Sequence, residues 1–167
     1  MKLIRFMLIS FTILFLFGCT PKLKVITYSD GTQYETGVKK LIDGGETEGE
    51  GQLLLVEAVL RCIEGEDCPG EDYWIILTYY GKFPLMDGKE VKAIADSKEI
   101  DIIDDPYFTN ELGEEWWEEY ELPYSKDDFR ILANAQKVEI QIGDRKLEVR
   151  QSNRILWKKL LDPFAEE

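Results

Sequence analysis

The chain has 167 residues, a formal net charge of −13 and no histidine. The acidic balance disfavours nucleic-acid binding, because affinity for phosphate chains comes mainly from Lys and Arg. The missing histidine excludes Ser-His-Asp and Cys-His catalysis and His-ligated zinc or iron. The sequence also contains no Gly-rich phosphate-binding motif. We therefore expect no nucleic-acid partner, no cofactor and no enzymatic activity.

The chain begins with the segment MKLIRFMLISFTILFLFGCTPK. Lys2 and Arg5 form a short basic start, and residues 6–17 form an uncharged apolar stretch. This is the layout of a secretory signal. The stretch is too short for a permanent membrane span, which needs roughly twenty apolar residues.

The signal ends in Leu-Phe-Gly-Cys at residues 16–19, and this ending resembles the lipobox of bacterial lipoproteins. It departs from that pattern at Phe17, where the family usually has a small residue. The resemblance implies that the thiol of Cys19 receives a diacylglycerol, that a peptidase removes residues 1–18, and that Cys19 becomes the first mature residue. In enteric bacteria, an Asp directly after the lipidated cysteine retains a lipoprotein in the inner membrane. Thr20 at that position therefore implies routing to the outer membrane. An uncleaved anchor, or an ordinary signal with a chance cysteine, is the alternative.

A lipidated Cys19 also predicts where the protein resides. Each buried methylene contributes about 0.8 kcal/mol, and stable attachment takes more than one acyl chain, which a diacylglyceryl group provides. We therefore expect a membrane partner through the lipid anchor, in the cell envelope, at the periplasmic face of the outer membrane or at the cell surface. Residues 19–24 would be the lipidated tether, and residues 25–167 are long enough for a single β-rich domain.

Lipidation of Cys19 leaves Cys62 and Cys68 as an even pair. An exported chain meets an oxidising compartment, so we predict a disulfide between these two cysteines. Zinc is the competing use, but structural zinc prefers four Cys or His ligands. Calcium prefers carboxylate oxygens, and the same segment is a weak candidate for it, with a solvated acidic turn as the simpler interpretation. The candidate ligands are Glu64, Glu66, Asp67, Glu71 and Asp72.

Turn signals divide the mature chain into short strands. Residues 24–28 and 32–35 flank Ser-Asp-Gly and predict a hairpin, while the Gly- and Glu-rich residues 44–51 predict a flexible loop. Residues 52–63 and 73–80 are apolar on both faces over part of their length, which is typical of central strands covered on both sides. We expect them to be antiparallel neighbours joined by the cysteine bridge. Their aromatic residues would be core or rim: Trp74, Tyr79 and Tyr80.

Residues 91–95 and 100–103 predict a second hairpin around residues 96–99. Residues 115–122 permit a helix or a strand, and the aromatic content favours the strand. One face of that strand would carry Trp116, Glu118, Tyr120 and Leu122.

The C-terminal part predicts helices around a third hairpin. Ser125, with an acidic residue three positions later, predicts a helix start, and residues 137–142 and 146–150 alternate around a Gly-Asp turn. Ser152 is expected to cap a last helix that Pro163 ends. The expected buried residues of the two helices are Phe129, Leu132, Ala133, Leu156, Trp157, Leu160 and Leu161. These elements predict a mainly β fold: an antiparallel β-sandwich or barrel-like sheet with one or two short α-helices near the C-terminus.

Residues 114–121, EEWWEEYE, are the most unusual stretch of the mature chain. Sugar sites combine stacking aromatic rings with paired acids, and on a strand Glu119 and Glu121 lie on one face about 7 Å apart. The candidate ligand-binding residues are therefore Trp116, Trp117, Glu119 and Glu121. The simpler interpretation is that Trp116 packs inward while the glutamates solvate an exposed or edge strand.

The sequence thus predicts a non-enzymatic envelope lipoprotein whose β-rich domain serves protein contact or structural support. A ligand-binding module for a glycan or calcium is the alternative.

Overall fold

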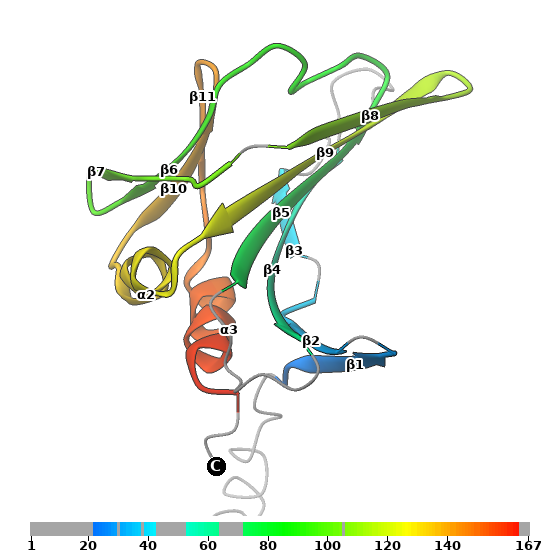
Figure 1. The fold of residues 1–167 in the computed structure, drawn as a ribbon. Coiled ribbons are helices and arrows are strands. Elements are labelled where there is room, and N and C mark those ends of the chain that lie inside the picture. Colours follow the sequence, from blue (N-terminus) through cyan, green and yellow to red (C-terminus); the bar gives the residue numbers. More distant parts are fainter. Residues whose placement is uncertain are drawn as a thin grey trace, which may run out of the picture.

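The computed structural model of the protein describes residues 22–29, 31–37, 39–42, 53–63, 72–104 and 106–163. This part of the chain is mainly β, with two antiparallel sheets and two helices. The predicted fold class is confirmed, and the described strands do not close into a barrel. Figure 1 shows the small sheet and both helices on one side of the large sheet.

The large sheet has seven strands in the order β1-β2-β4-β5-β9-β8, and β3 also pairs with β4. Its strands are β1 (Lys24–Tyr28), β2 (Gly31–Glu35), β3 (Lys39–Ile42), β4 (Leu53–Ile63), β5 (Asp72–Gly81), β8 (Tyr107–Leu112) and β9 (Glu115–Tyr124). The small sheet has the order β11-β10-β6-β7, formed by β6 (Val91–Ala95), β7 (Lys98–Ile100), β10 (Val138–Ile142) and β11 (Arg145–Glu148). The helices are α2 (Lys126–Asn134) and α3 (Gln151–Leu161).

The long strands β4, β5 and β9 form the centre of the large sheet, and all their pairings are antiparallel. The predictions of the β1–β2 and β10–β11 hairpins, of β4 and β5 as neighbours, and of a strand at β9 are therefore confirmed. The strands β3 and β8 have no counterpart among the expected elements.

The turn between β6 and β7 is shorter than expected. Asp96 and Ser97 both have positive φ, 47° and 72°, which is the backbone of a two-residue type I′ turn. Lys98 and Glu99 therefore belong to β7, where they pair with β6. The carboxylate of Asp96 also accepts hydrogen bonds from the backbone N–H groups of Gln136 and Lys137, at 3.1 and 2.8 Å.

The two helices differ in how they begin. The Oγ of Ser125 caps α2 by accepting a hydrogen bond from the N–H of Asp128, as predicted. The expectation that Ser152 caps α3 is wrong, because Ser152 lies inside the helix and is exposed. The backbone carbonyl of Arg150 accepts the first helical bonds, so Arg150 is the N-cap residue and provides no side-chain cap.

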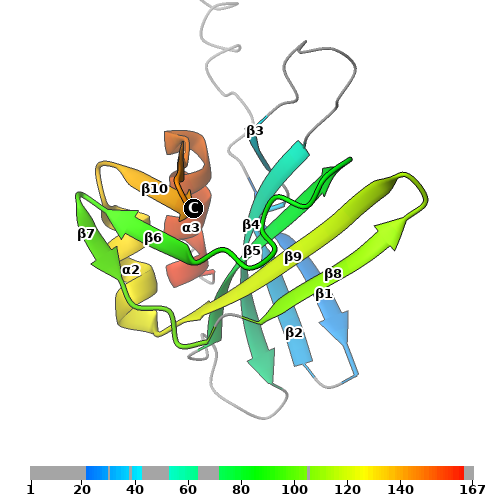
Figure 2. The same cartoon turned by 90° about the horizontal axis from the view of Figure 1, so that it is seen from above.

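A single core joins these layers. α2 packs against β5, β6, β9 and α3, while α3 packs against β4 (Figures 1 and 2). The ring of Phe129 on α2 stacks on Tyr73 at a centroid distance of 4.7 Å and lies 5.9 Å from Trp157 on α3. The predicted helix faces are buried, with Leu161 only partly so.

Candidate functional site: the open face of the large sheet

The large sheet has two unlike faces. Its inner face carries side chains such as Ile75, Leu77 and Leu122, none of which has any exposed surface. On the other face most side chains of β4, β5 and β9 are half-buried, although Val59 and Pro123 are buried there. The expectation that the central strands are covered on both sides is therefore wrong over most of their length. In the described chain, the small sheet and both helices lie on the inner side, which leaves the second face without a packed layer (Figure 2).

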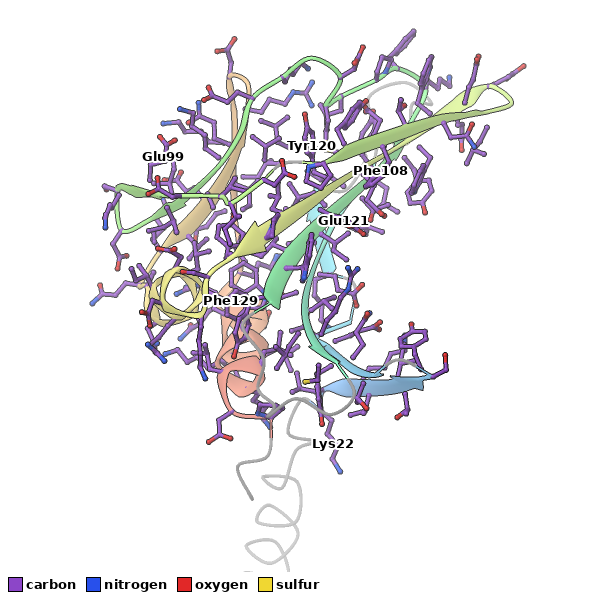
Figure 3. The ribbon with its side chains drawn as sticks, viewed as in Figure 1. Lys22, Glu99, Phe108, Tyr120, Glu121 and Phe129 are labelled. Atoms are coloured by element: carbon purple, nitrogen blue, oxygen red, sulfur yellow. The ribbon has the colours of Figure 1, made fainter. Side chains whose placement is uncertain are left out.

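We call this second face the open face. Its central residues come from alternate positions of four adjacent strands: Leu53, Leu55, Glu57 and Arg61 on β4, Trp74, Ile76, Thr78 and Tyr80 on β5, Trp117, Glu119 and Glu121 on β9, and Phe108 and Asn110 on β8. Side chains of antiparallel neighbours that stand opposite each other point to the same face. The pairing therefore forms rows, with Tyr80 beside Trp117 and Thr78 beside Glu119. Figure 3 shows Glu121 and Phe108 from this face and Phe129 in the core.

The structure divides the predicted ligand-binding residues. Trp117, Glu119 and Glu121 share the open face, whereas Trp116 alternates with them and lies on the inner face opposite Gly81 and Glu111. Of the other aromatic residues, Trp74 and Tyr80 are half-buried on the open face, while Tyr79 is buried in the core.

Some of the charges on the open face are paired. The guanidinium of Arg61 lies 4.8 Å from the centroid of the Trp74 ring, and its Nη2 is 3.5 Å from Oε1 of Glu121. Such an arrangement combines a cation–π contact with an ion pair. Glu35 on β2 accepts a hydrogen bond of 2.7 Å from the Lys24 ammonium.

Two carboxylates of the open face form no ion pair with any described side chain. Among the described residues, neither Glu57 nor Glu119 has a cation within ion-pair distance, and Glu119 only accepts a hydrogen bond of 3.1 Å from the hydroxyl of Thr78. Burial raises the pKa of Glu119, and Glu121 raises it further. Burial also raises the pKa of Glu57, and Glu35 raises it further, while the charge of Lys24 and the backbone N–H of Gly37 lower it. For both carboxylates burial thus outweighs the groups that stabilise the charged form, which costs free energy when they are charged.

A third carboxylate is buried on the inner face. Glu118 has no exposed surface and accepts hydrogen bonds from the backbone N–H groups of Leu85, Met86 and Asp87. Its Oε1 also accepts a hydrogen bond of 2.5 Å from the hydroxyl of Tyr107. The interpretation of all these glutamates as solvating groups on an edge strand is therefore wrong for Glu118, and β9 lies between β5 and β8 rather than at an edge.

The remaining predicted sites fall largely outside the described residues. These are Cys19, Cys68, Glu64, Glu66, Asp67 and Glu71, so the lipidation, disulfide and calcium predictions stay predictions. Cys62 lies near the end of β4 and Asp72 begins β5. Within the described ranges, no three His, Cys, Asp or Glu side chains are grouped so that they could hold a metal ion. Neither described helix is long and apolar enough to cross a bilayer.

Comparison of the chain with protein-family models, curated protein sequences and solved structures finds no match. The chemistry of the open face therefore has to be inferred from its own geometry. Aromatic rings beside partly buried carboxylates without a counter-ion are suited to accept a cationic or polar group that carries apolar surface.

Proposed function

We propose that this chain is a lipid-anchored protein of the bacterial cell envelope whose β domain binds a partner protein on the open face. The lipobox resemblance at residues 16–19 supports the anchor. The observation that supports binding is the pair Glu57 and Glu119, two half-buried carboxylates that form no ion pair within the described part of the chain, set among Ile76, Tyr80 and Trp117.

The chemistry of this surface defines the partner. A Lys or Arg side chain would neutralise Glu119 and lie against the Trp117 ring, as Arg61 already does with Glu121 and Trp74 on the same face. The aliphatic and aromatic rim would contact the apolar part of the same segment. Arg, Tyr and Trp are the residues that most often dominate the free energy of protein interfaces. We therefore expect a partner with a basic and apolar contact region.

The anchor is tested by intact mass measurement on protein from native membranes, with and without reduction. Acylation at Cys19 with loss of residues 1–18 supports the anchor, and a reduction-dependent gain of two hydrogens supports the Cys62–Cys68 bridge. An unmodified Cys19 on an uncut chain would refute the anchor without affecting the proposal for the open face.

The docking surface is tested by photo-crosslinking in native membranes. A photoreactive amino acid at Tyr80 is expected to yield an adduct of one defined mass, whereas the same group at the exposed Ile155 on α3 is not. Replacing Glu57 and Glu119 by Gln should abolish the adduct. The control replaces Asp144 by Asn and Glu148 by Gln, which removes two charges from the exposed β10–β11 hairpin and should leave the adduct intact. Equal loss in both double variants would refute the proposal.

Glycan binding is the second candidate, because Tyr80 and Trp117 stand side by side next to Glu119. A thermal-shift screen with cell-wall sugars, and with calcium for the acidic segment, separates the candidates. A stabilisation by a sugar that Trp117→Ala abolishes would favour glycan binding over protein docking.

A further inference from the structure

The outer strand β8 presents one backbone edge that has no partner in the described chain. The N–H of Glu121 on β9 donates to the carbonyl of Pro106 at 3.1 Å. Hydrogen-bonded and non-hydrogen-bonded positions alternate along an antiparallel pair. The backbone groups of Phe108, Asn110 and Leu112 therefore bond toward β9. Those of the alternate residues point outward: Tyr107, Thr109 and Glu111.

The other sheet edges carry features that hinder strand addition, and β8 does not. Very short edge strands and basic side chains are two such features. β7 has three residues, β11 has four with Arg145 and Lys146 among them, and β1 begins with Lys24. β8 has six residues, none of them Lys, Arg or Pro, and pairs with β9 without a bulge.

The exposed side chains of β8 provide apolar surface that strand pairing would bury. Phe108 and Leu112 are 46% and 52% exposed and both belong to the open-face side of the strand. Asn110 lies between them, and on the inner side Thr109 and Glu111 are exposed. The strand is thus nearly symmetric about Asn110 in polarity.

We propose that β8 pairs with β8 of a second copy of this chain, antiparallel and centred on Asn110, so that the two large sheets become one. In this register Thr109 stands opposite Glu111 of the second copy, and both have outward backbone groups that can bond. Phe108 stands opposite Leu112 of the second copy, and the two-fold symmetry forms this apolar pair twice.

The alternative registers are less favourable. The two copies are related by a two-fold axis perpendicular to the sheet, which places open-face residues opposite open-face residues. This axis must pass beside a residue of β8, so the alternative registers centre on a neighbouring residue instead of Asn110. Centring on Glu111 would place two carboxylates opposite each other, which is destabilising. Centring on Thr109 would place Phe108 opposite Asn110 and lose both apolar pairs. Of these three registers, only the one centred on Asn110 forms two apolar pairs and places no like charges opposite each other.

The pairing is tested by disulfide trapping of the full chain in its native membranes. Asn110 of each copy would form a non-hydrogen-bonded pair with a Cα separation of about 4.5 Å, which is within disulfide range. Asn110→Cys should therefore form a covalent dimer under mild oxidation. Thr109→Cys should not, because its equivalent is displaced diagonally by about 7–8 Å. The native chain, with the same three other cysteines, gives the background.

A second substitution tests the backbone bonds. Thr109→Pro removes an outward N–H that makes no bond to β9, so an edge strand can accept it. It should slow trapping of Asn110→Cys at least about tenfold, equivalent to about 1.4 kcal/mol, whereas Thr109→Val, which keeps the N–H, should not. Far-ultraviolet circular dichroism checks that each variant is folded. Absence of trapping at Asn110, equal trapping at Thr109, or insensitivity to Thr109→Pro would each overturn the proposal.

Discussion

Glu118→Gln is expected to destabilise the protein strongly although it preserves shape and removes a buried charge. The Glu118 carboxylate uses both oxygens as acceptors: Oε1 binds the N–H groups of Met86 and Asp87 and the Tyr107 hydroxyl, and Oε2 binds the N–H of Leu85. An amide has only one acceptor atom, so its NH₂ group must face backbone donors in either orientation.

The structure gives the magnitude of this effect. Leu85 and Met86 are 3% and 0% exposed, so a lost acceptor leaves a buried N–H without a partner. Each such group costs about 1–3 kcal/mol, and the weakening of the charge-assisted bonds adds to it. We expect a loss of about 2–4 kcal/mol in the free energy of unfolding. With a urea m-value of about 2 kcal/mol/M, the denaturation midpoint should fall by about 1–2 M.

The assay is urea denaturation followed by tryptophan fluorescence. Glu119→Gln is the matched control, because it changes the next residue of β9 on the open face and keeps an oxygen to accept from Thr78. Its unfolding free energy should be equal to or slightly above that of the native chain. Weakening of the bonds from Glu118 to the backbone of residues 85–87 should also expose the segment between β5 and β6, with faster tryptic cleavage at Lys82 and Lys89. A Glu118→Gln protein within about 0.5 kcal/mol of the native chain would refute the reasoning, because mutational differences of that size are typical of surface sites.

Three further predictions follow from the same structure. The double variant Glu57→Gln/Glu119→Gln should be more stable than the native chain at neutral pH, because the folded-state pKa values of both carboxylates are raised. The stability of the native chain should rise as the pH falls through these pKa values and approach that of the variant near the ordinary Glu pKa. A constant difference in stability across a pH series of denaturation curves would contradict this. Gly81→Ala should lower the free energy of unfolding by about 1–3 kcal/mol, measured by thermal denaturation, because the new Cβ would lie 2.0 Å from Oη of Tyr79. Gly88→Asn should lower it by less than half as much, because Gly88 has a φ of 64° and open space around the new side chain. Ser125→Ala should cost about 1 kcal/mol through loss of the α2 cap, while Ser152→Ala should cost almost nothing; equal costs would mean that the caps are wrongly assigned.

Strong alternation and turn chemistry made much of the fold predictable. The β10–β11 hairpin and α2 follow directly from such local signals, because their side chains and turns are satisfied within a few residues. β8 was missed because its polar residues Thr109 to Glu111 are exposed and its pairing depends on β9. The Ser152 cap was wrong because the serine lies two residues beyond the N-cap Arg150, whose carbonyl accepts the first helical bonds.

The open face was predictable only in part. Alternation along β9 placed Glu119 with Glu121 and separated them from Glu118, as the structure confirms. Which of these faces would be buried was not predictable, because that depends on where the small sheet and helices pack. The contributions of Trp74, Glu57 and Arg61 come from strands distant in the sequence, and no local pattern connects them with Trp117.

Site-resolved titration of the Glu57 and Glu119 side-chain carboxyls by ¹³C NMR tests the docking account most directly. The proposed site depends on burial outweighing the groups that stabilise these two charges before a partner binds. We expect both to titrate above the ordinary Glu value of about 4.3. If both titrate at or below that value, they are already compensated within the protein, and the open face has no vacancy for a partner's cation.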